Sequence, residues 1–177
     1  TDWWRSEPAF SAFAMNIFDR MVMWAGEVDR FVIDHRGGEA LLALARAGRG
    51  AIRVGAHLGS FDMLRLISRQ YGLRLNVLMY TDRSELVTSF FASLGGGSLV
   101  RVIRLDPASV QSAFEIKACL ARGEFVGILA DRVHPGGRER PVETLFVGRR
   151  AAFPLSPFLL GVVLGAPMFL SLCTSTG

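Results

Sequence analysis

A histidine and an aspartate five positions apart, His57 and Asp62, are the side chains whose types and spacing best suit catalysis. A neutral imidazole can remove a proton as a general base. A carboxylate that binds the other ring nitrogen fixes the orientation and the tautomer of the imidazole. The pair therefore predicts proton abstraction from a substrate hydroxyl or amine.

The residues around this pair predict how the two side chains could meet. Residues 51–56 are short and β-prone, so His57 is expected to end a buried strand. Ser60 can cap a helix over about 61–71, with Asp62 in its first turn. The turn before this helix would bring the carboxylate back to the ring, whereas a continuous helix would separate the two side chains. An acid in a first helical turn also complements the helix dipole, so the pair needs support from elsewhere in the chain.

Length and composition indicate one domain with a substantial core. The chain has 177 residues, of which 50% are hydrophobic, and we expect it to be a fragment of a longer protein because it begins at Thr1. The net charge of +4 favours acidic partners such as phosphorylated lipids, an acidic carrier protein or coenzyme A. The basic residues are dispersed and are not interleaved with exposed aromatics, so no nucleic acid is expected as a partner.

The cysteines and histidines do not predict a metal site. Cys119 and Cys173 lie in apolar stretches, where core packing is the expected role of both. The spacing among His35, His57 and His134 matches no zinc-ligand pair. We therefore expect neither a metal nor a bound cofactor.

Two apolar segments raise the question of membrane contact. The helix expected over 9–25 carries many large apolar side chains, for which the core is the main expectation and a bilayer the alternative. The run 153–173 has no charged residue, but its prolines and glycines favour a helix over 155–164 and a strand over 168–172 rather than a spanning segment.

Between these segments, strands alternate with helices. The expected strands are 31–33, 51–56, 73–79, 100–105 and 125–130, and the expected helices are 39–47, 61–71, 83–94 and a helix that opens at Asp106-Pro107 and runs to 122. Such alternation predicts an α/β fold with a mainly parallel central sheet flanked by helices. The pattern does not predict the order of the strands.

A second group of polar residues follows a later strand. Ligands of parallel sheets bind at the carboxyl ends of the strands, where His57 and the pair Asp131-Arg132 are both expected. The roughly twenty residues after Arg132 show no periodicity and are expected to form a functional or mobile loop. Within it, Arg138 and Arg140 are expected to be solvated surface residues.

Three segments together resemble a known superfamily. The run 57–62 resembles the His-x4-Asp motif of the lysophospholipid acyltransferases, and most closely the branch of bacterial lipid A (Kdo-lipid) late acyltransferases. Residues 128–132 resemble the second block of that branch, a strand ending in Asp followed by Arg or Gln. Residues 146–154 resemble its third block, an aromatic-Gly-Arg segment that leads to Phe-Pro, and 164–169 resemble the entry to the next strand.

The resemblance covers roughly residues 10–173 and implies a glycerol-phosphate-acyltransferase-like fold over the single domain 1–177. The acidic Glu-Gly that follows Phe-Pro in the glycerol-phosphate branch is absent from 153–156, which favours the lipid A-like branch. The implied enzyme is an acyltransferase that moves a fatty acyl group from a thioester to a hydroxyl or amine. His57 is the implied base and Asp62 its orienting acid. The implied substrate-binding residues are Asp131, Arg132, Gly148, Arg149, Arg150, Phe153 and Pro154.

The resemblance also implies the partners and the place of action. Acyl carrier protein or coenzyme A would carry the acyl thioester as co-substrate, and a lipid or glycolipid would accept the acyl group. A peripheral or anchored position on the cytoplasmic face of a bacterial inner membrane follows. Two alternatives remain: a catalytically silent module of the same fold that binds lipid or carrier protein, and a hydrolase that uses Ser60 or Cys119 as nucleophile.

Overall fold

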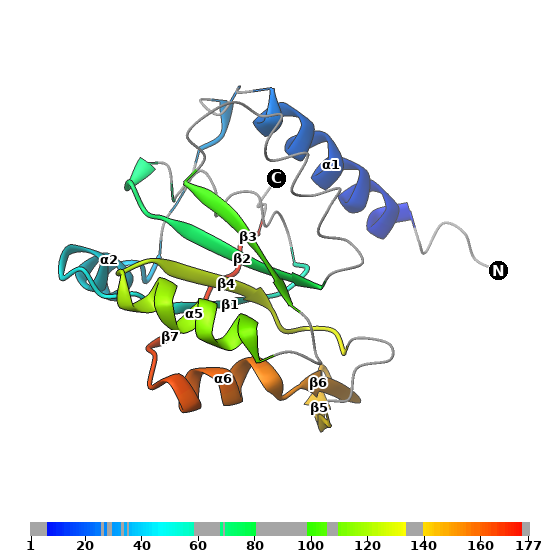
Figure 1. The fold of residues 1–177 in the computed structure, drawn as a ribbon. Coiled ribbons are helices and arrows are strands. Elements are labelled where there is room, and N and C mark those ends of the chain that lie inside the picture. Colours follow the sequence, from blue (N-terminus) through cyan, green and yellow to red (C-terminus); the bar gives the residue numbers. More distant parts are fainter. Residues whose placement is uncertain are drawn as a thin grey trace.

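The computed structural model of this chain describes residues 7–25, 27, 30–32, 34, 36–58, 68, 70–80, 99–105, 110–133 and 140–174. The described part is built on a parallel β-sheet with helices on both of its faces, and a separate hairpin lies beside one end of the sheet (Figure 1). This architecture confirms the α/β fold and the mainly parallel central sheet predicted from the sequence.

The sheet has five strands in the order β3-β2-β4-β1-β7, and every neighbouring pair is parallel. Its strands are β1 (Ile52–Gly55), β2 (Leu75–Tyr80), β3 (Val100–Leu105), β4 (Phe125–Leu129) and β7 (Met168–Leu170). The helices are α1 (Glu7–Trp24), α2 (Glu39–Arg46), α5 (Gln111–Ala121) and α6 (Ser156–Leu164). The hairpin pairs β5 (Pro141–Phe146) with β6 (Arg149–Pro154).

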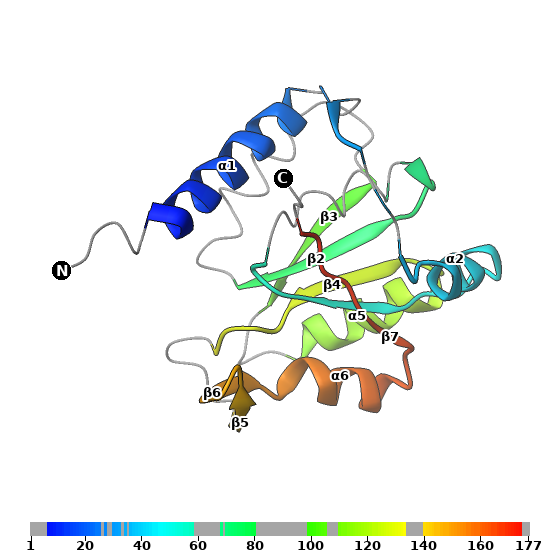
Figure 2. The same ribbon diagram turned by 180° about the vertical axis from the view of Figure 1, so that it is seen from behind.

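Alternating side chains of the central strands fill a core on each face of the sheet. In β4, Val126 and Ile128 point to the face covered by α5 and α6, and Phe125 points to the face covered by α2 (Figures 1 and 2). The central strand β4 is buried from Phe125 to Ile128, in agreement with its continuous apolar sequence, whereas β1 and β2 also bury the polar residues Arg53 and Asn76. Helix α6 approaches the sheet closely at Gly161, where an added Cβ would lie only 2.1 Å from the sulfur of Met168 on β7.

The uncharged run 153–173 forms the end of β6, the helix α6 and the strand β7, as its prolines and glycines predict. Within the described part of the chain, no helix combines the length and the apolar character needed to cross a bilayer.

Three sequence predictions are wrong in the described residues. Phe31 and Val32 are not in a strand, and Val32 is fully exposed, because three apolar residues between polar ones do not make a buried strand. The segment after Arg132 is not a loop throughout, since it contains the β5–β6 hairpin. Helix α5 begins at Gln111, and Val110 before it is not helical, so the predicted helix does not run unbroken from Asp106-Pro107, two residues that lie outside the described ones.

The expectation that α1 packs in the core is also wrong for most of its large side chains. Met23 is buried, whereas Phe10, Phe13, Met15, Phe18 and Met21 are each more than half exposed. Apolar residues surround this helix instead of forming one stripe, so a single packing face cannot cover them. The expected helix 83–94 and most of the expected helix 61–71 lie outside the described residues, apart from Ser68 and Gln70, which are helical.

Candidate functional site

The candidate site lies at the carboxyl ends of β1 and β4, two neighbouring strands at the centre of the sheet. Their parallel register pairs Gly55 with Leu129, and the amide of Ala130 donates to the carbonyl of Gly55 over 2.9 Å. His57 and Asp131 each come two residues after this last pair, so the register places them opposite one another. Ligands of open parallel sheets bind at this edge.

The two side chains are in direct contact. Nδ1 of His57 lies 2.9 Å from Oδ1 of Asp131 and 3.2 Å from Oδ2. The imidazole side chain is 46% exposed and the carboxylate 23%. The carboxylate is therefore partly shielded from water, while the ring can be reached from solvent.

The electrostatics of this pair define the tautomer of the histidine. Burial raises the pKa of Asp131, but hydrogen bonds from the side chain and backbone of His57 outweigh burial, so the pKa is lowered overall. An ionised carboxylate only accepts hydrogen bonds, so Nδ1 of His57 carries the proton that it donates. In the neutral ring, Nε2 then holds the lone pair and is the nitrogen that can accept a proton.

Arg132 follows directly and brings a guanidinium group to the same edge. Its Nε lies 3.9 Å from Oδ2 of Asp131, and its side chain is 73% exposed. An ion pair this long and this exposed holds the guanidinium only weakly. Most of its N–H donors can therefore reach an anionic group of a ligand.

The remaining predicted binding residues lie on the β5–β6 hairpin. Gly148 is in the turn, Arg149 and Arg150 open β6, and the ring of Phe153 packs edge-on against Phe146 with centroids 5.6 Å apart. Pro154 is buried at the end of β6.

Arg150 pairs with Glu143 over 3.6 Å. Arg138 lies outside the described residues and Arg140 is exposed. The hairpin lies near the end of the sheet at which β4 finishes (Figure 1). Among the described residues, however, no hydrogen bond or ion pair joins it to His57 or Asp131.

The structure brings together His57 and Asp131, a pairing that the sequence reasoning did not assign. Asp131 was expected to bind substrate, and Asp62 was expected to orient the imidazole. Asp62 and Ser60 lie outside the described residues, so the predicted contact between His57 and Asp62 stays a prediction. His57 and Asp131 meet because β1 and β4 are neighbours in the sheet. The order of the residues along the chain does not reveal that these two strands are adjacent.

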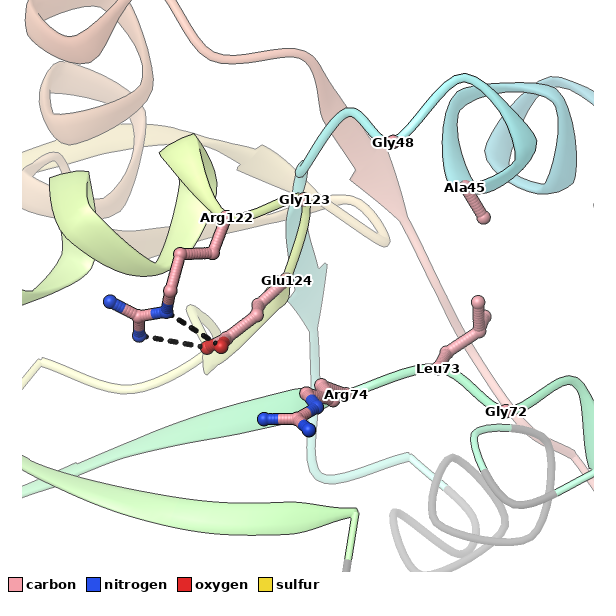
Figure 3. Close-up of a pocket in the computed structure, with 8 residues that line it drawn as sticks. All are labelled: Ala45, Gly48, Gly72, Leu73, Arg74, Arg122, Gly123 and Glu124. Atoms are coloured by element: carbon pink, nitrogen blue, oxygen red, sulfur yellow. Dashed lines mark hydrogen bonds and ion pairs between the residues drawn. The ribbon is translucent and has the colours of Figure 1, made fainter.

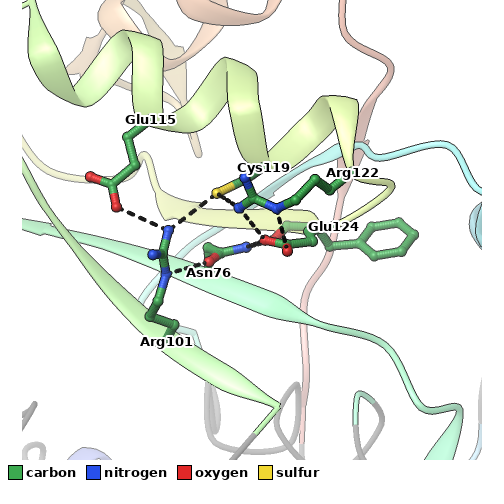
Figure 4. A network of polar contacts seen from close by, with 7 residues as sticks. Asn76, Arg101, Glu115, Cys119, Arg122 and Glu124 are labelled. Atoms are coloured by element: carbon green, nitrogen blue, oxygen red, sulfur yellow. Dashed lines mark hydrogen bonds and ion pairs between the residues drawn. The ribbon is translucent and has the colours of Figure 1, made fainter.

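A second polar cluster occupies the opposite, amino end of the strands. Arg122 donates from Nε and Nη2 to Glu124, and Asn76 donates to the same carboxylate over 2.9 Å (Figure 4). Arg101 links Asn76 to Glu115 on α5. These contacts join β2, β3, β4 and α5, so the cluster has a structural role in the sheet.

Cys119 belongs to this cluster and is not suited to nucleophilic catalysis. Its side chain is completely buried and accepts hydrogen bonds from Arg101 and Arg122, each over 3.3 Å. Burial is the largest influence on the thiol and its pKa is raised, which disfavours the thiolate. The predicted core role is confirmed for Cys119, whereas Cys173 is only partly buried.

A hollow of about 250 Å³ lies at this same amino end, between α2 and the turns that enter β2 and β4 (Figure 3). It is open and is lined by backbone at Gly48, Gly72 and Gly123 and by the side chains of Arg74 and Glu124. Asp131 lies seven positions after Glu124 along an extended strand, which places the hollow roughly 20 Å from the imidazole. It is therefore separate from the candidate site.

Within the described residues, no three His, Cys, Asp or Glu side chains gather as a metal site would require. Comparison of the chain with known protein families and with curated proteins found no match. The functional assignment therefore rests on the residues themselves.

Proposed function

We propose that this protein is an acyltransferase that moves a fatty acyl group from a thioester to a hydroxyl or amine of a lipid-linked or glycolipid acceptor. The observation that carries the proposal is the 2.9 Å contact between Nδ1 of His57 and Asp131 at the carboxyl edge of the parallel sheet. It supplies an oriented general base in the place where such a sheet binds ligands. The glycerol-phosphate-acyltransferase-like form of the fold is part of this proposal.

The chemistry needs no covalent enzyme intermediate. Nε2 of His57 takes the proton of the acceptor while its oxygen or nitrogen forms a bond to the thioester carbonyl carbon. The tetrahedral intermediate then collapses, the carbon–sulfur bond breaks, and the imidazolium returns the proton to the leaving thiolate. A negative charge next to the ring stabilises the imidazolium during this cycle.

Two carboxylates compete for the orienting role. Asp131 is in contact with Nδ1 in the structure, and Asp62 is the acid of the resembled His-x4-Asp motif. We assign the orienting role to Asp131 because its geometry and its lowered pKa fit an ionised acceptor of the Nδ1 proton. Asp62 is kept as the competing candidate, and the two substitutions separate them.

The arginines suit anionic substrates. Arg132 would hold a phosphate or carboxylate group next to the base, and Arg149 and Arg150 would contact a more distant part of the acceptor or donor. Gly148, Phe153 and Pro154 shape the hairpin that presents these arginines. Acyl carrier protein or coenzyme A would deliver the thioester, since both carry negative charge, and the site of action would be the cytoplasmic face of a bacterial inner membrane.

The test is acyl transfer by the purified protein from acyl carrier protein or coenzyme A thioesters to a bacterial lipid extract. The products are read by mass spectrometry of the lipids and by release of free thiol. We expect His57→Ala to lower turnover by about 10²–10⁴-fold, the usual contribution of a general base.

Asp131→Asn and Asp62→Asn are compared in the same assay, and the acid whose loss is more severe is the orienting group. Asp34→Asn is the matched control, because Asp34 is an exposed acid that pairs only with Arg36 in the described structure. Full turnover in His57→Ala would refute the mechanism. Lipid bound without any turnover in the wild type would favour the silent binding module.

A further inference from the structure

The turn of the β5–β6 hairpin has an unusual residue at its tip. Val147 and Gly148 connect the paired residues Phe146 and Arg149, with φ angles of 52° and 74°. Two successive positive φ angles in a two-residue turn favour Asn-Gly, because asparagine and glycine tolerate the left-handed region. A β-branched residue rarely adopts this conformation.

Burial of the side chain does not compensate for this strain in the described structure. Val147 is 86% exposed, so its side chain gains almost no burial. It is the one residue other than glycine with a positive φ among those that the structure describes. Strained residues persist where the surroundings or a function favour them, and here an apolar side chain is held out into solvent.

Further exposed apolar side chains lie beside Val147 on the hairpin and on α6. Leu145 and Phe146 are 75% and 59% exposed beside Val147. On α6, the exposed side chains are Phe158, Leu159, Val162 and Val163, which share the helix face opposite the buried Pro157 and Gly161. In both views the hairpin and α6 lie on the same side of the molecule, away from α1 (Figures 1 and 2). We call these residues of the hairpin and α6 the hairpin–α6 surface.

The charge next to this surface has one predominant sign. The segment 140–154 contains three arginines, Arg140, Arg149 and Arg150, against one acid, Glu143. All four side chains are exposed, and the one ion pair that they make with described residues joins Arg150 to Glu143. Apolar side chains flanked by arginines match a lipid surface with anionic headgroups, where the chains enter the acyl region and the guanidinium groups meet phosphates.

We propose that the hairpin–α6 surface binds the protein to a bilayer that contains anionic lipids, with Val147 at the tip of the inserted hairpin. The proposal deepens the proposed function, because it names the surface that would bring the His57–Asp131 edge to a lipid acceptor, but binding itself requires no acyl transfer. The exposed side chains of α1 are a second apolar surface on the other side of the molecule, but α1 carries one arginine, Arg20, against two acids, Glu7 and Asp19, so it lacks the excess of positive charge found on the hairpin.

The test is flotation of the full chain with vesicles of phosphatidylcholine alone or mixed with phosphatidylglycerol. We expect tighter binding to the mixed vesicles, and weaker binding as salt is raised.

Val147→Asn should weaken binding about tenfold, since burying one valine side chain is worth roughly that factor. Because asparagine suits the positive φ, this variant should fold at least as well as the wild type, which a thermal melt checks. The double variant Val162→Ser/Val163→Ser should also bind more weakly.

Val32→Asn is the matched control, because Val32 is fully exposed in the connection between α1 and α2 and should bind like the wild type. His57→Ala should also bind the vesicles as the wild type does, so loss of turnover and loss of membrane binding are measured separately.

The proposal is overturned if the wild type binds neither vesicle, or if Val147→Asn binds as tightly as the wild type. It is also overturned if Phe13→Ser on α1, and not the hairpin variant, abolishes binding. A dimer that Val147→Asn dissociates, without vesicle binding by either protein, would assign the surface to self-association instead.

Discussion

Replacing Glu124 with glutamine should cost stability that depends on pH. The carboxylate lies directly before β4, its side chain is only 10% exposed, and it receives two hydrogen bonds from Arg122, at 2.8 and 3.1 Å, and one from Asn76 at 2.9 Å. The amide nitrogen of a glutamine is itself a hydrogen-bond donor and would face the N–H groups of Arg122 and Asn76, which are also donors. Glu124→Gln therefore leaves buried groups of the amino-end cluster without acceptors.

The size of the effect follows from the pKa of this carboxyl. Hydrogen bonds from Arg122 have the largest effect and lower the pKa of Glu124. Burial raises this pKa, and the hydrogen bond from Asn76 lowers it further, so that it falls from 4.5 to about 2. One pKa unit corresponds to about 1.4 kcal/mol, which sets an upper limit of roughly 3 kcal/mol. Because Arg122 is half exposed to water, we expect Glu124→Gln to destabilise the protein by roughly 1–3 kcal/mol at pH 7.

The sign of the pH dependence is fixed by the direction of this shift. A carboxyl whose pKa is lower in the folded protein stabilises the fold fully above its unfolded pKa, and this stabilisation is lost as the pH falls from 4.5 towards about 2. The difference in unfolding free energy between wild type and variant should therefore shrink over this range. Urea unfolding followed by circular dichroism at several pH values measures it.

Glu115→Gln is the matched control for this experiment. Glu115 also pairs with an arginine, Arg101, over 2.9 Å, but its side chain is 42% exposed. Its substitution should change stability by less than about 1 kcal/mol. Equal effects of the two substitutions, or an unchanged pH dependence in Glu124→Gln, would refute the reasoning.

Three further predictions concern the site, the hairpin and the core. On the proposed mechanism, Asp131→Asn should lower turnover by up to about 10⁴-fold, because a neutral amide neither fixes the Nδ1–H tautomer nor stabilises the imidazolium. Release of free thiol at the wild-type rate would contradict this prediction. Val147→Asn should stabilise the fold by about 1 kcal/mol in thermal or urea unfolding, and a destabilised variant would show that the turn is not strained. Gly50→Ala should destabilise it by at least about 2 kcal/mol, since the new Cβ would lie 2.4 and 2.7 Å from two backbone carbonyl oxygens. Gly38→Ala, with open space around the Cβ, is the control and should unfold like the wild type.

Much of the sheet could be predicted because its strands are short, mainly apolar segments rich in β-branched residues between glycines and polar turns. Residues 125–130, for example, follow Gly123 and alternate Val126 and Ile128 towards one core. The hairpin was missed for a related reason: its turn has Val147 where asparagine is expected, so the local turn signal is absent. The exposure of α1 could not be foreseen from its composition, since apolar content alone does not tell whether other elements supply a partner face.

The partner of His57 was the hardest part of the site to predict. Asp62 is near in sequence, whereas Asp131 is 74 positions away and becomes a neighbour only because β4 lies beside β1. Strand order depends on how the crossover connections pack over the sheet, and a local pattern of residues does not encode it. Sequence reasoning brought both residues to the same edge, because each follows a strand, but could not pair them.

The central place of β4 has a consequence for how the nascent chain acquires its shape. β1 and β2 both pair with β4 and not with each other, so a ribosome that has released β1, β2 and β3 has exposed only one native strand pair, β2–β3. The edge of β1 that pairs with β4 therefore stays unpaired until residue 129 has left the exit tunnel. Docking of β4 also delivers Asp131 to His57, so that β1, β2 and the proposed base are brought together in the same step, before β7 adds to β1.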